Sequence, residues 1–451
     1  MDNLTVIVLA AGGGTRMKSK TMKVLHPIAG RSMIGHVLTA VQAVEPTRVV
    51  AVVGHQREQV GPHITEMLPD AVLAVQEKQE GTGHAVRIAM EAAGTTTGTV
   101  IVAAGDTPLL EGESLRAFAE EHEAAQRAVS ILSGRVPNPF GYGRIVRNAE
   151  GDVEAIVEEK DATPEQREID EISSGILAFD AEFLVSALAR ITNDNAKGEY
   201  YLTDAVGLAR EDGLTVGAHL IDDVAQTEGA NDRAQLAELG KELNRRIVTR
   251  WMKDGVTVMD PATTWIEADV VIEPDATILP GTQLLGATVV REDAVVGERA
   301  TVGPFAYLRP GTQLGVAGKI GTFVETKNAQ IGDGAKVPHL SYVGDAEIGE
   351  GTNIGAGTIF ANYDGVAKHR TVVGRHARTG SNNTFVAPVS IGDGAGTAGG
   401  TVVRRDVPAG ALGVSASAQR NLEGWTESRR AGTAQAEAAR TAREQQEKTD
   451  G

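Results

Sequence analysis

Three consecutive glycines and two basic side chains follow the first strand-like run of the chain. Residues 5–10 are rich in Val, Ile and Leu, glycines occupy 12–14 directly after them, and Arg16 and Lys23 come next. Glycines at the carboxyl end of a strand let backbone N–H groups turn toward a phosphate chain, to which Arg and Lys add positive charge. The run lacks the Gly-Lys-Ser/Thr of a Walker A loop and the spacing of a dinucleotide-binding G-x-G-x-x-G. A glycine run alone is weak evidence, so the prediction of a phosphate site depends on the whole string LAAGGGTRM and the Lys that follows it.

Polar and basic side chains also gather in the C-terminal half, wherever a six-residue repeat is interrupted. The repeat slips near residue 330, near residue 345 and over residues 360–373. Loops at such interruptions can add chemistry to a scaffold. A lone His in this setting is more often structural, but its polar and basic neighbours here favour a catalytic role. The residues concerned are Arg309, Glu325, Lys327, His339, Tyr342, Asn353, Asn362, Tyr363, Asp364 and Lys368.

A zinc site is the alternative for the histidines of this region. His369 and His376 lie among basic residues in KHRTVVGRHAR, and no spacing ties them to His339. Zinc sites need several ligands at fixed spacing, so the sequence disfavours a metal there.

The repeat itself predicts the element that must position the second set. Aliphatic residues recur every six positions from Ile266, often followed by Gly, which fits neither a helix nor a hairpin and is typical of a hexapeptide parallel β-helix. Each aliphatic residue is expected to point to the axis, with the Gly allowing the corner. The main run is Ile266, Ile272, Ile278, Leu284, Val290, Val296, Val302, Leu308, Leu314, Ile320 and Thr326.

The whole chain of 451 residues divides into four predicted parts. Residues 1–230 alternate strands with helices, which indicates an α/β, Rossmann-like domain with a mostly parallel sheet. Residues 231–252 carry apolar side chains at three- and four-residue spacing and predict a linking helix. Residues 253–430 form the repeat domain. Residues 431–451 have almost no large apolar side chain and predict a disordered tail or a loose helix.

The composition of the chain excludes several classes of binding partner. A formal net charge of −17 argues against a general nucleic-acid or anionic-membrane surface. The chain has no Cys, which excludes disulfides and thiolate chemistry. Neither a membrane-length apolar run nor a signal-peptide pattern is present, so a cytoplasmic protein is expected.

The string around the glycines resembles the sugar-nucleotidyltransferase family, whose mark is L-A-A-G-x-G-T-R-M followed by a Lys. Further marks occur in the family's order, ending in GYGRI, IVEEK and GANDR segments. The resemblance implies that Arg16 is catalytic and that Asp106 and Asn231 hold Mg²⁺, which prefers oxygen ligands. It implies nucleotide and sugar contacts at Leu9, Ala10, Ala11, Gly12, Lys23, Gln76, Gly81, Thr82, Ala104, Gly105, Asp106, Gly143, Glu158, Ser173 and Asn231.

One of these positions departs from the family's pattern. Members commonly have Asn where this chain has Ser173. Ser keeps a hydroxyl but loses the paired donor and acceptor of the amide, so a sugar contact is expected through the hydroxyl alone. Because attack of a sugar 1-phosphate on a nucleoside triphosphate brings two anions together, charge neutralisation and positioning should dominate catalysis.

The C-terminal set resembles the acetyltransferase domain of the bifunctional N-acetylglucosamine-1-phosphate uridyltransferase / glucosamine-1-phosphate N-acetyltransferase family, over residues 3–425 in all. The resemblance implies a left-handed β-helix, homotrimers and an active site between subunits. His339 would be the general base, because imidazole titrates near neutral pH, and Glu325 could orient it. Substrate contacts are implied at Arg309, Lys327, Tyr342, Asn353 and Lys368, and acetyl-CoA contacts at Ala356, Asn362, Tyr363, Ser381, Gly399 and Ala416.

Three further positions lie near the expected coenzyme groove. Ala416 stands where some members carry Arg, so Arg420 is a candidate for meeting the coenzyme's phosphate. Gly399 stands where Ala is frequent, which should be harmless if only backbone contacts matter. Trp425 could close the site from a neighbouring subunit or pack on the end of the coil.

The expected function is synthesis of UDP-N-acetylglucosamine for the cell envelope, with acetyl-CoA and UTP as co-substrates and Mg²⁺ as cofactor. A nucleotidyltransferase with a purely regulatory repeat domain is one alternative, and a non-catalytic trimeric scaffold is another. His339 and the segment NYDG argue against the first, and the second predicts that His339→Ala leaves every activity intact.

Overall fold

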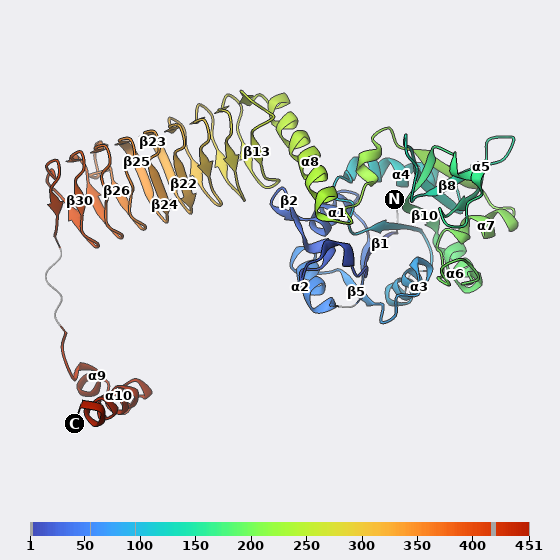
Figure 1. Cartoon of the computed structure of the whole chain (residues 1–451), viewed down its shortest axis with the longest axis horizontal. Helices are drawn as coiled ribbons and strands as arrows, with labels where there is room; N and C mark the ends of the chain where they lie inside the picture. The colour runs from blue at the N-terminus through green and yellow to red at the C-terminus, as the bar shows by residue number, and fades with distance from the viewer. Residues whose placement is uncertain (1–2, 55, 95, 416–420, 451) are drawn as a thin grey trace.

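The structure is a computed structural model that describes residues 3–54, 56–94, 96–415 and 421–450. An α/β domain at the amino end is joined by helix α8 (Arg233–Lys253) to a long stack of parallel strands (Figure 1). The predicted fold classes of the two halves are confirmed. The order of elements fits the alternation of strand and helix patterns, followed by the six-residue repeat, read from the sequence.

The N-terminal sheet has the strand order β11-β7-β10-β6-β1-β4-β5. Strands β1, β4, β5 and β6 are parallel to one another, whereas β10 is antiparallel to both β6 and β7. The expectation of a mostly parallel sheet therefore holds for its first half, and β10, with the hairpin β8–β9, makes the sheet mixed. The strands are β1 (Leu4–Ala10), β4 (Arg48–Val53), β5 (Val72–Val75), β6 (Thr99–Ala104), β7 (Val129–Arg135), β8 (Gly143–Arg147), β9 (Val153–Val157), β10 (Glu171–Asp180) and β11 (Val216–Leu220).

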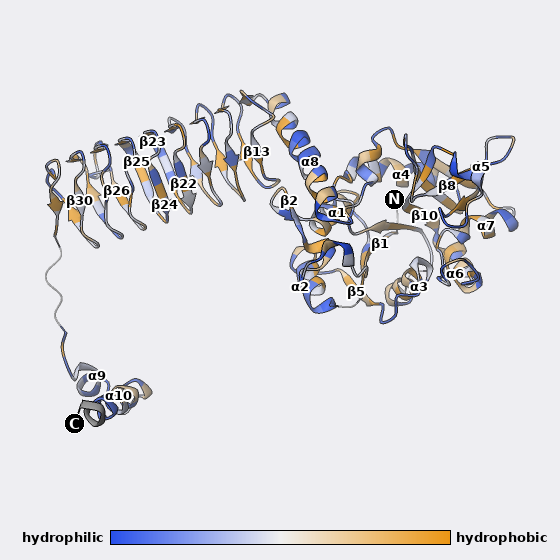
Figure 2. Cartoon of the chain, viewed as in Figure 1, coloured by the Kyte–Doolittle hydropathy of each residue, from blue (hydrophilic) through white to orange (hydrophobic). Residues whose placement is uncertain are grey.

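Apolar side chains on both faces of this sheet explain why helices cover it on both sides. β1 is buried along nearly its whole length and is coloured hydrophobic in Figure 2. Its alternate side chains belong to two separate hydrophobic clusters, one on each face. The helices are α1 (Met33–Gln42), α2 (Arg57–Met67), α3 (Thr82–Ala93), α4 (Gly112–Ala124), α5 (Pro164–Arg167), α6 (Ala181–Arg190) and α7 (Asp204–Glu211), with 3₁₀ turns η1 (Thr15–Met17), η2 (Lys23–Leu25) and η3 (Val224–Thr227).

The C-terminal strands form a parallel β-helix with three strands to a coil. Val289 pairs with Tyr307 and Tyr307 with Glu325, each 18 residues further along the chain. The first coils contain β12 (Thr257–Val258), β13 (Trp265–Ile266), β14 (Val271–Ile272), β15 (Thr277–Ile278), β16 (Gln283–Leu284), β17 (Val289–Val290), β18 (Val295–Val296), β19 (Thr301–Val302), β20 (Tyr307–Leu308) and β21 (Gln313–Leu314). The later coils contain β22 (Lys319–Thr322), β23 (Glu325–Ile331), β24 (Lys336–His339), β25 (Tyr342–Ile348), β26 (Ile359–Ala361), β27 (Thr371–Val373), β28 (Thr384–Val386), β29 (Val389–Ile391), β30 (Gly396–Thr397), β31 (Val402–Val403) and β32 (Leu412–Gly413).

The residues on the six-residue beat fill the axis of the coil, as predicted. Each aliphatic member from Ile266 to Ile320 is at most 3% exposed. Further down, Phe360 and Phe385 meet edge to face with ring centroids 5.0 Å apart. Their burial confirms that the repeat marks the core, and residues two positions before a beat, such as Ala276, Thr288 and Ala294, are buried as well.

Interruptions of the beat are changes in coil length. Glu325 pairs with Tyr342 after 17 residues rather than 18. Ala346 then pairs with Thr371 after 25 residues, because the segment between Asn362 and His369 loops out of the coil. The slips seen in the sequence are therefore real, and the longest one is an outward loop.

The glycines that follow the beat residues have a different cause from the one expected. At Gly355 a Cβ atom would lie 2.1 Å from the carbonyl oxygen of Gly380 on the next coil, yet its φ is not positive. Left-handed φ angles occur instead at non-glycine corner residues such as Phe305, Phe323 and Leu340. Close approach of successive coils, rather than the turning of the corner, requires this glycine.

Helix α8 and a hairpin of the N-terminal domain cover the first coil. Asn244 on α8 donates to the carbonyl oxygen of Thr264 at 2.8 Å and accepts from the N–H of Ile266 at 2.9 Å. The hairpin β2 (Pro27–Ile28) and β3 (Arg31–Ser32) contributes the carbonyl oxygen of Ala29, which accepts from the N–H of Ala268 at 2.9 Å. An open strand edge is thereby paired rather than left free.

The last part of the chain is helical. Helix α9 (Trp425–Arg429) is followed by α10 (Ala434–Asp450), which agrees with the loose helix rather than the disordered tail among the two alternatives for 431–451. Arg443 on α10 forms an ion pair with Glu427 on α9 at 2.6 Å. The Ala, Arg, Glu and Gln residues of α10 have high helix propensity.

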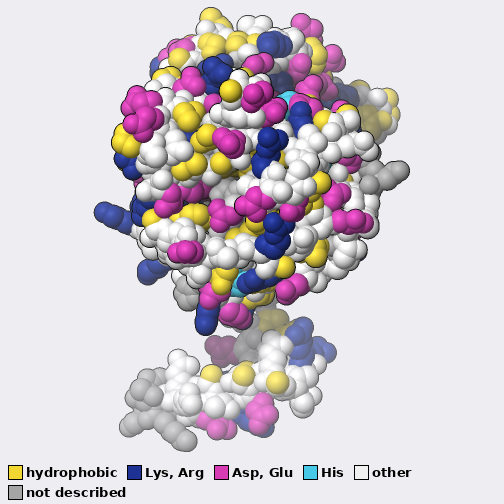
Figure 3. Space-filling model, turned by 90° about the vertical axis from the view of Figure 1, so that its right-hand side faces the viewer, with side chains coloured by type: hydrophobic (Ala, Val, Ile, Leu, Met, Phe, Trp, Pro, Cys, Tyr) yellow, Lys and Arg dark blue, Asp and Glu magenta, His cyan; other side chains and the backbone are white. Residues whose placement is uncertain are grey.

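No helix within the described residues is long and apolar enough to cross a membrane. Acidic and basic side chains are interspersed on the face of the N-terminal domain shown in Figure 3.

Candidate functional site

The glycine-rich turn borders a cavity of about 360 Å³ at the carboxyl ends of β1 and β6. Gly14 has a φ of +55°, and a Cβ atom there would lie 2.5 Å from Cβ of Lys23, so a glycine allows the turn to approach η2. Most of the nucleotide-contact residues expected from the sequence line this cavity together. They are Leu9, Ala11, Gly12, Lys23, Gln76, Gly81, Thr82, Ala104 and Asp106.

Lys23 joins the two residues expected to hold a metal. Its Nζ forms an ion pair with Asp106 and donates to Oδ1 of Asn231 at 2.9 Å. Arg16 donates to the same Asn231 oxygen at 2.8 Å. Asn231 stands directly before α8, whose first turn is capped by Asp232. Four residues from three distant segments therefore meet at one charged point.

Asp106 and Asn231 fit a hard divalent cation. Their carboxylate and amide oxygens both face the Lys23 ammonium, which shows that one cation can reach both. Oxygen ligands, few of them from protein, are what Mg²⁺ prefers when phosphates and water supply the rest. Within the described residues no group of three or more His, Cys, Asp or Glu side chains could hold a metal, so the protein contributes at most a partial set of ligands.

The far wall of the cavity is built by Gln76 and the start of α3. Gln76 is only 4% exposed and donates from Nε2 to the carbonyl oxygen of Gly81 at 3.2 Å. The hydroxyl of Thr82 accepts from the N–H of Leu202 at 3.1 Å. Backbone hydrogen bonds between Tyr200 and the segment 80–83 hold this wall in place. Gln79 and Glu199 also line the cavity and were not singled out from the sequence.

A second cavity, of about 750 Å³, adjoins the predicted sugar segments and is lined in part by Phe140 and Glu158. Gly143 on β8 pairs with Ser173 on β10, and a Cβ atom at Gly143 would lie 3.6 Å from Oε1 of Glu158. The three residues expected to contact a sugar therefore lie together. The Ser173 hydroxyl accepts from the N–H of Gly175 at 3.3 Å, so it retains its proton for donation to a ligand.

An acidic residue close to Glu158, Asp204, was missed by sequence reasoning. Burial raises the pKa of Glu158, against hydrogen bonding from Thr203 and the charge of Lys197. Burial and the neighbouring Glu158 and Asp161 raise the pKa of Asp204 to about 6. Thr203 and Asp204 follow the segment KGEYYL, whose Lys and Tyr residues were the available signal.

The remaining two contacts expected in this domain lie beside the cavity. Ala10, the last residue of β1, is buried in the core. Gly105 donates from its N–H to the carbonyl oxygen of Leu9 at 2.9 Å. They shape the strand ends that carry the site.

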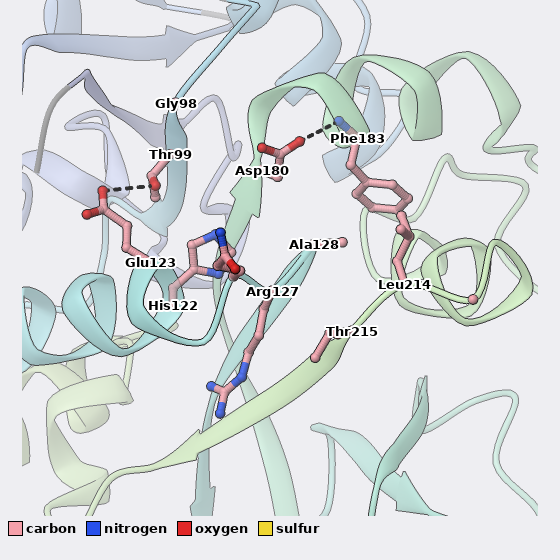
Figure 4. A pocket seen from close by; sticks show the side chains of 12 residues that line it. Gly98, Thr99, His122, Glu123, Arg127, Ala128, Asp180, Phe183, Leu214 and Thr215 are labelled. Carbon is pink, nitrogen blue, oxygen red and sulfur yellow. Dashed lines mark hydrogen bonds between the residues drawn. The ribbon is translucent and has the colours of Figure 1, made fainter.

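A third hollow lies at the opposite edge of the sheet, around His122, Asp180 and Phe183 (Figure 4). Its polar groups are already paired. Nδ1 of His122 contacts the Ser130 hydroxyl at 2.9 Å, Asp180 accepts from the N–H of Phe183, and Thr99 bonds Glu123 at 3.1 Å. Carboxyl ends of parallel strands are the usual location of ligand sites in such sheets, so this hollow is not the candidate site.

In the β-helix, His339 begins a column of equivalent corner positions. Its carbonyl oxygen accepts from the N–H of Gly357, that of Ala356 accepts from Asn382, and that of Ser381 accepts from Gly400. His339, Ala356, Ser381 and Gly399 therefore occupy the same position on four successive coils. Three of the residues expected to contact acetyl-CoA, Ala356, Ser381 and Gly399, therefore lie in line with the predicted base.

The basic residues lie across the adjacent strands. Arg309 donates from its N–H to the carbonyl oxygen of Thr326 at 2.9 Å, which places it beside Lys327. Lys327 lies next to Lys368, whose charge lowers the pKa of Lys327. A hydrogen bond of 2.8 Å between His369 and Asn362 closes the outward loop that carries Lys368. Cations brought this close form a ready site for a phosphate dianion.

Three neighbours complete this region. Glu325 accepts from Arg309 at 2.9 Å, so its carboxylate is engaged with a basic residue rather than with His339 as expected. The backbone of Asn353 forms a parallel β-bridge with that of Lys336, on an adjacent side of the coil. The Tyr363 hydroxyl donates to the carbonyl oxygen of Gly365 within the loop. Ala416 and Arg420 lie outside the described residues.

Comparison with known proteins gives one match to the N-terminal domain and others to nearly the whole chain. The family model for MobA-like NTP transferase domains matches residues 6–168. A protein named bifunctional protein GlmU from Thermobifida fusca (strain YX) is 55% identical over 473 residues, which cover 98% of this chain and 98% of the relative. The chain belongs to the GlmU family.

Other members show the same extent of likeness. The GlmU of Streptomyces avermitilis is 53% identical, covering 99% of this chain and 98% of its own length. The GlmU of Corynebacterium efficiens is 51% identical, covering 97% of this chain and 96% of its own length. As a GlmU family member the chain is a bifunctional enzyme, and its N-terminal half has the nucleotidyltransferase fold.

Proposed function

We propose that the chain makes UDP-N-acetylglucosamine in two steps at two separate sites. The C-terminal site transfers an acetyl group from acetyl-CoA to glucosamine 1-phosphate. The N-terminal site joins the product to UMP from UTP and releases pyrophosphate, which supplies cell-envelope precursors. The observation that carries the proposal is the convergence of Arg16, Lys23, Asp106 and Asn231 at one point of a chain whose β-helix holds a second cluster of cations and a His.

At the N-terminal site, a phosphate oxygen of the sugar 1-phosphate attacks the α-phosphorus of UTP. The new P–O bond forms as the bond to pyrophosphate breaks, and negative charge moves onto the leaving group. Arg16 and Lys23 lie where they can neutralise that charge and hold both anions in line. Gln76, Gly81 and Thr82 form the wall expected to face the uracil ring. Gly143, Glu158 and Ser173 border the expected sugar position.

Mg²⁺ is the proposed metal of this site, held by Asp106 and Asn231. When bound, it supplies further neutralisation of the triphosphate charge. Lys23 is then free to exchange its carboxylate partner for a phosphate.

At the C-terminal site, the amine of glucosamine 1-phosphate attacks the thioester carbonyl carbon of acetyl-CoA. His339 takes the amine proton, the C–N bond forms, and the C–S bond breaks to release the coenzyme thiol. Arg309, Lys327 and Lys368 hold the sugar phosphate, and Tyr342 and Asn353 face the sugar. Ala356, Ser381 and Gly399 provide a narrow corner of small residues along which the coenzyme can lie.

A homotrimer is proposed as the working state. Phe305, Phe323 and Leu340 are 54%, 56% and 61% exposed, and Phe323 and Leu340 stand at the corner position directly after that of Thr322 and His339. The rings of Phe305 and Phe323 stack with centroids 5.2 Å apart. An exposed apolar column of this kind marks an interaction surface, and a three-sided coil can bury it by threefold packing. A neighbouring subunit would then border His339, and Trp425 is a candidate for closing the site from there.

The substrates are small molecules, and a cytoplasmic location is proposed because UTP and acetyl-CoA are used there. The proposal is tested by supplying purified protein with glucosamine 1-phosphate, acetyl-CoA, UTP and Mg²⁺, and following free thiol and pyrophosphate separately. Both products should appear, with thiol release preceding pyrophosphate. Pyrophosphate formed only from added N-acetylglucosamine 1-phosphate, without thiol, would instead favour a single-activity nucleotidyltransferase.

A further inference from the structure

Asp345 binds two asparagines in the proposed acetyl-transfer site, although nothing in the sequence singled it out. Its Oδ1 accepts from Nδ2 of Asn328 at 2.8 Å, and its Oδ2 accepts from Nδ2 of Asn362 at 2.5 Å. The three residues stand at the same corner of successive coils, on β23, on β25 and directly after β26. Each carboxylate oxygen of Asp345 is therefore used by a different coil.

The contact fixes which way the Asn362 amide faces. Because its NH₂ end is given to Asp345, its carbonyl oxygen is the end left to meet a ligand. Nδ2 of Asn362 also lies 3.5 Å from the Tyr342 hydroxyl. Asn362 is only 8% exposed, so rotation of the amide is restricted by packing as well. A residue expected to contact acetyl-CoA is thus oriented by a carboxylate beneath it.

The charge of the same carboxylate also acts on Lys327 and Lys368. Partial burial raises the pKa of Asp345, but the hydrogen bonds from Asn328 and Asn362 and the charges of Lys327 and Lys368 outweigh it, so its pKa lies below the usual range. The Asp345 charge in turn opposes the repulsion between Lys327 and Lys368. The Asp345 carboxylate is thus a fixed negative charge close to the site that is proposed to bind the sugar phosphate.

We propose that Asp345 is a positioning residue for acetyl transfer, which orients the Asn362 amide and whose charge lessens the repulsion between Lys327 and Lys368 where the sugar phosphate is to bind. It does not touch the reacting atoms. This inference rests on the proposed acetyltransferase function of the C-terminal site. It deepens that function by assigning substrate binding, rather than proton transfer, to a residue below the site.

The first test is Asp345→Asn, which keeps the shape but removes the charge and one acceptor. The KM values for acetyl-CoA and glucosamine 1-phosphate should each rise about tenfold, as expected when a hydrogen bond to a charged group is lost. The kcat value should change far less, because His339 is untouched. Glu347→Gln is the matched control: Glu347 is an exposed carboxylate on β25 whose ion pair, at 3.6 Å, is with Arg370. Its KM values should stay at the wild-type level.

A second test swaps the pair. Asn362→Asp alone places two carboxylates together and should raise the KM for acetyl-CoA steeply. The double variant with Asp345→Asn restores an amide–carboxylate hydrogen bond, so part of that loss should be recovered, which a double-mutant cycle measures as coupling. Uridyl transfer and the Tm of each variant report on the fold independently.

The outcomes distinguish the proposed acetyltransferase function from the role of Asp345 within it. Absence of acetyl transfer in the wild-type chain would refute the proposed function itself. Wild-type KM values in Asp345→Asn, a fall confined to kcat, or additive effects in the swap would overturn the role of Asp345 while leaving the acetyltransferase intact.

Discussion

The carbonyl oxygen of His339 accepts a hydrogen bond of 3.1 Å from the N–H of Gly357, one coil further along the β-helix. This contact makes Ala356 the direct successor of His339 in the corner column. Ser381 and Gly399 continue the same line. The proposed base and the proposed coenzyme groove are thereby parts of one surface.

A bulky side chain in this column should block the coenzyme without disturbing the base. Ala356→Tyr is expected to raise the KM for acetyl-CoA at least about tenfold, equivalent to about 1.4 kcal/mol. Its KM for glucosamine 1-phosphate and its uridyl transfer should stay near wild type. Steady-state kinetics with each substrate varied in turn checks this. An unchanged KM for acetyl-CoA would remove Ala356 from the groove.

Two glycines of this corner should differ sharply on substitution by Ala. A Cβ atom at Gly355 would lie 2.1 Å from the carbonyl oxygen of Gly380, whereas at Gly399 the nearest atom would be 3.7 Å away. Gly355→Ala should therefore lose about 1–3 kcal/mol of stability through overpacking. Gly399→Ala should stay within about 0.5 kcal/mol of wild type. Thermal unfolding of both variants compares them, and equal Tm values would contradict the close-approach explanation.

Substitution of Asn244 should lower the stability of the protein markedly. It is 7% exposed, and its amide pairs with both Thr264 and Ile266 at the open edge of the first coil. Asn244→Ala leaves two buried backbone groups without partners, so a loss of about 2–4 kcal/mol is expected. Lys241→Ala, on the exposed side of α8, is the control. Fluorescence of Trp265, at the same junction, follows the unfolding; coincident transitions for the two variants would rule out the capping role.

Buried histidines of the N-terminal domain should make stability pH-dependent. Burial and nearby Arg127 lower the pKa of His122 to about 4, and burial lowers that of His36 to about 4 as well. Between the ordinary value of 6.5 and about 4, the unfolded chain binds protons that the folded chain does not. Their contribution is present above pH 6.5 and falls by up to about 1.4 kcal/mol per unit for each His as the pH drops.

The His122 contribution can be isolated by substitution. His122→Gln keeps a polar group near Ser130 but removes the titration, so its Tm should fall less between pH 7 and pH 5 than that of the wild type. Calorimetry at several pH values measures the difference in slope, which is independent of any constant destabilisation. Parallel curves for the two proteins would show that His122 is not responsible.

The sequence predicted the architecture well because its signals are local. A buried aliphatic residue every sixth position specifies the coil, and alternating strand and helix patterns specify the first domain. The antiparallel strand β10 was not anticipated, since an alternation of strands and helices does not specify the direction of a single strand. For the tail the sequence left two alternatives, a disordered segment and a loose helix, between which its low apolar content could not decide.

The candidate sites were predictable only where motifs carried them. Gln76 and Asp106 belong to recognisable strings, and the structure brings them to one cavity. Asp345 could not be found, because its importance comes from Asn328 and Asn362 on other coils. The alignment of His339 with Ala356, Ser381 and Gly399 was also hidden, since the coils that separate successive members have unequal lengths.

The central claim is that one chain carries two separable active sites, and a pair of variants tests it most directly. Asp106→Ala and His339→Ala are assayed in parallel for pyrophosphate release from UTP with N-acetylglucosamine 1-phosphate, and for thiol release from acetyl-CoA with glucosamine 1-phosphate. Asp106→Ala should lose the first activity and keep the second, and His339→Ala should do the reverse. If both variants remained folded and trimeric yet each lost both activities, or if His339→Ala left both intact, the two-site account would be contradicted.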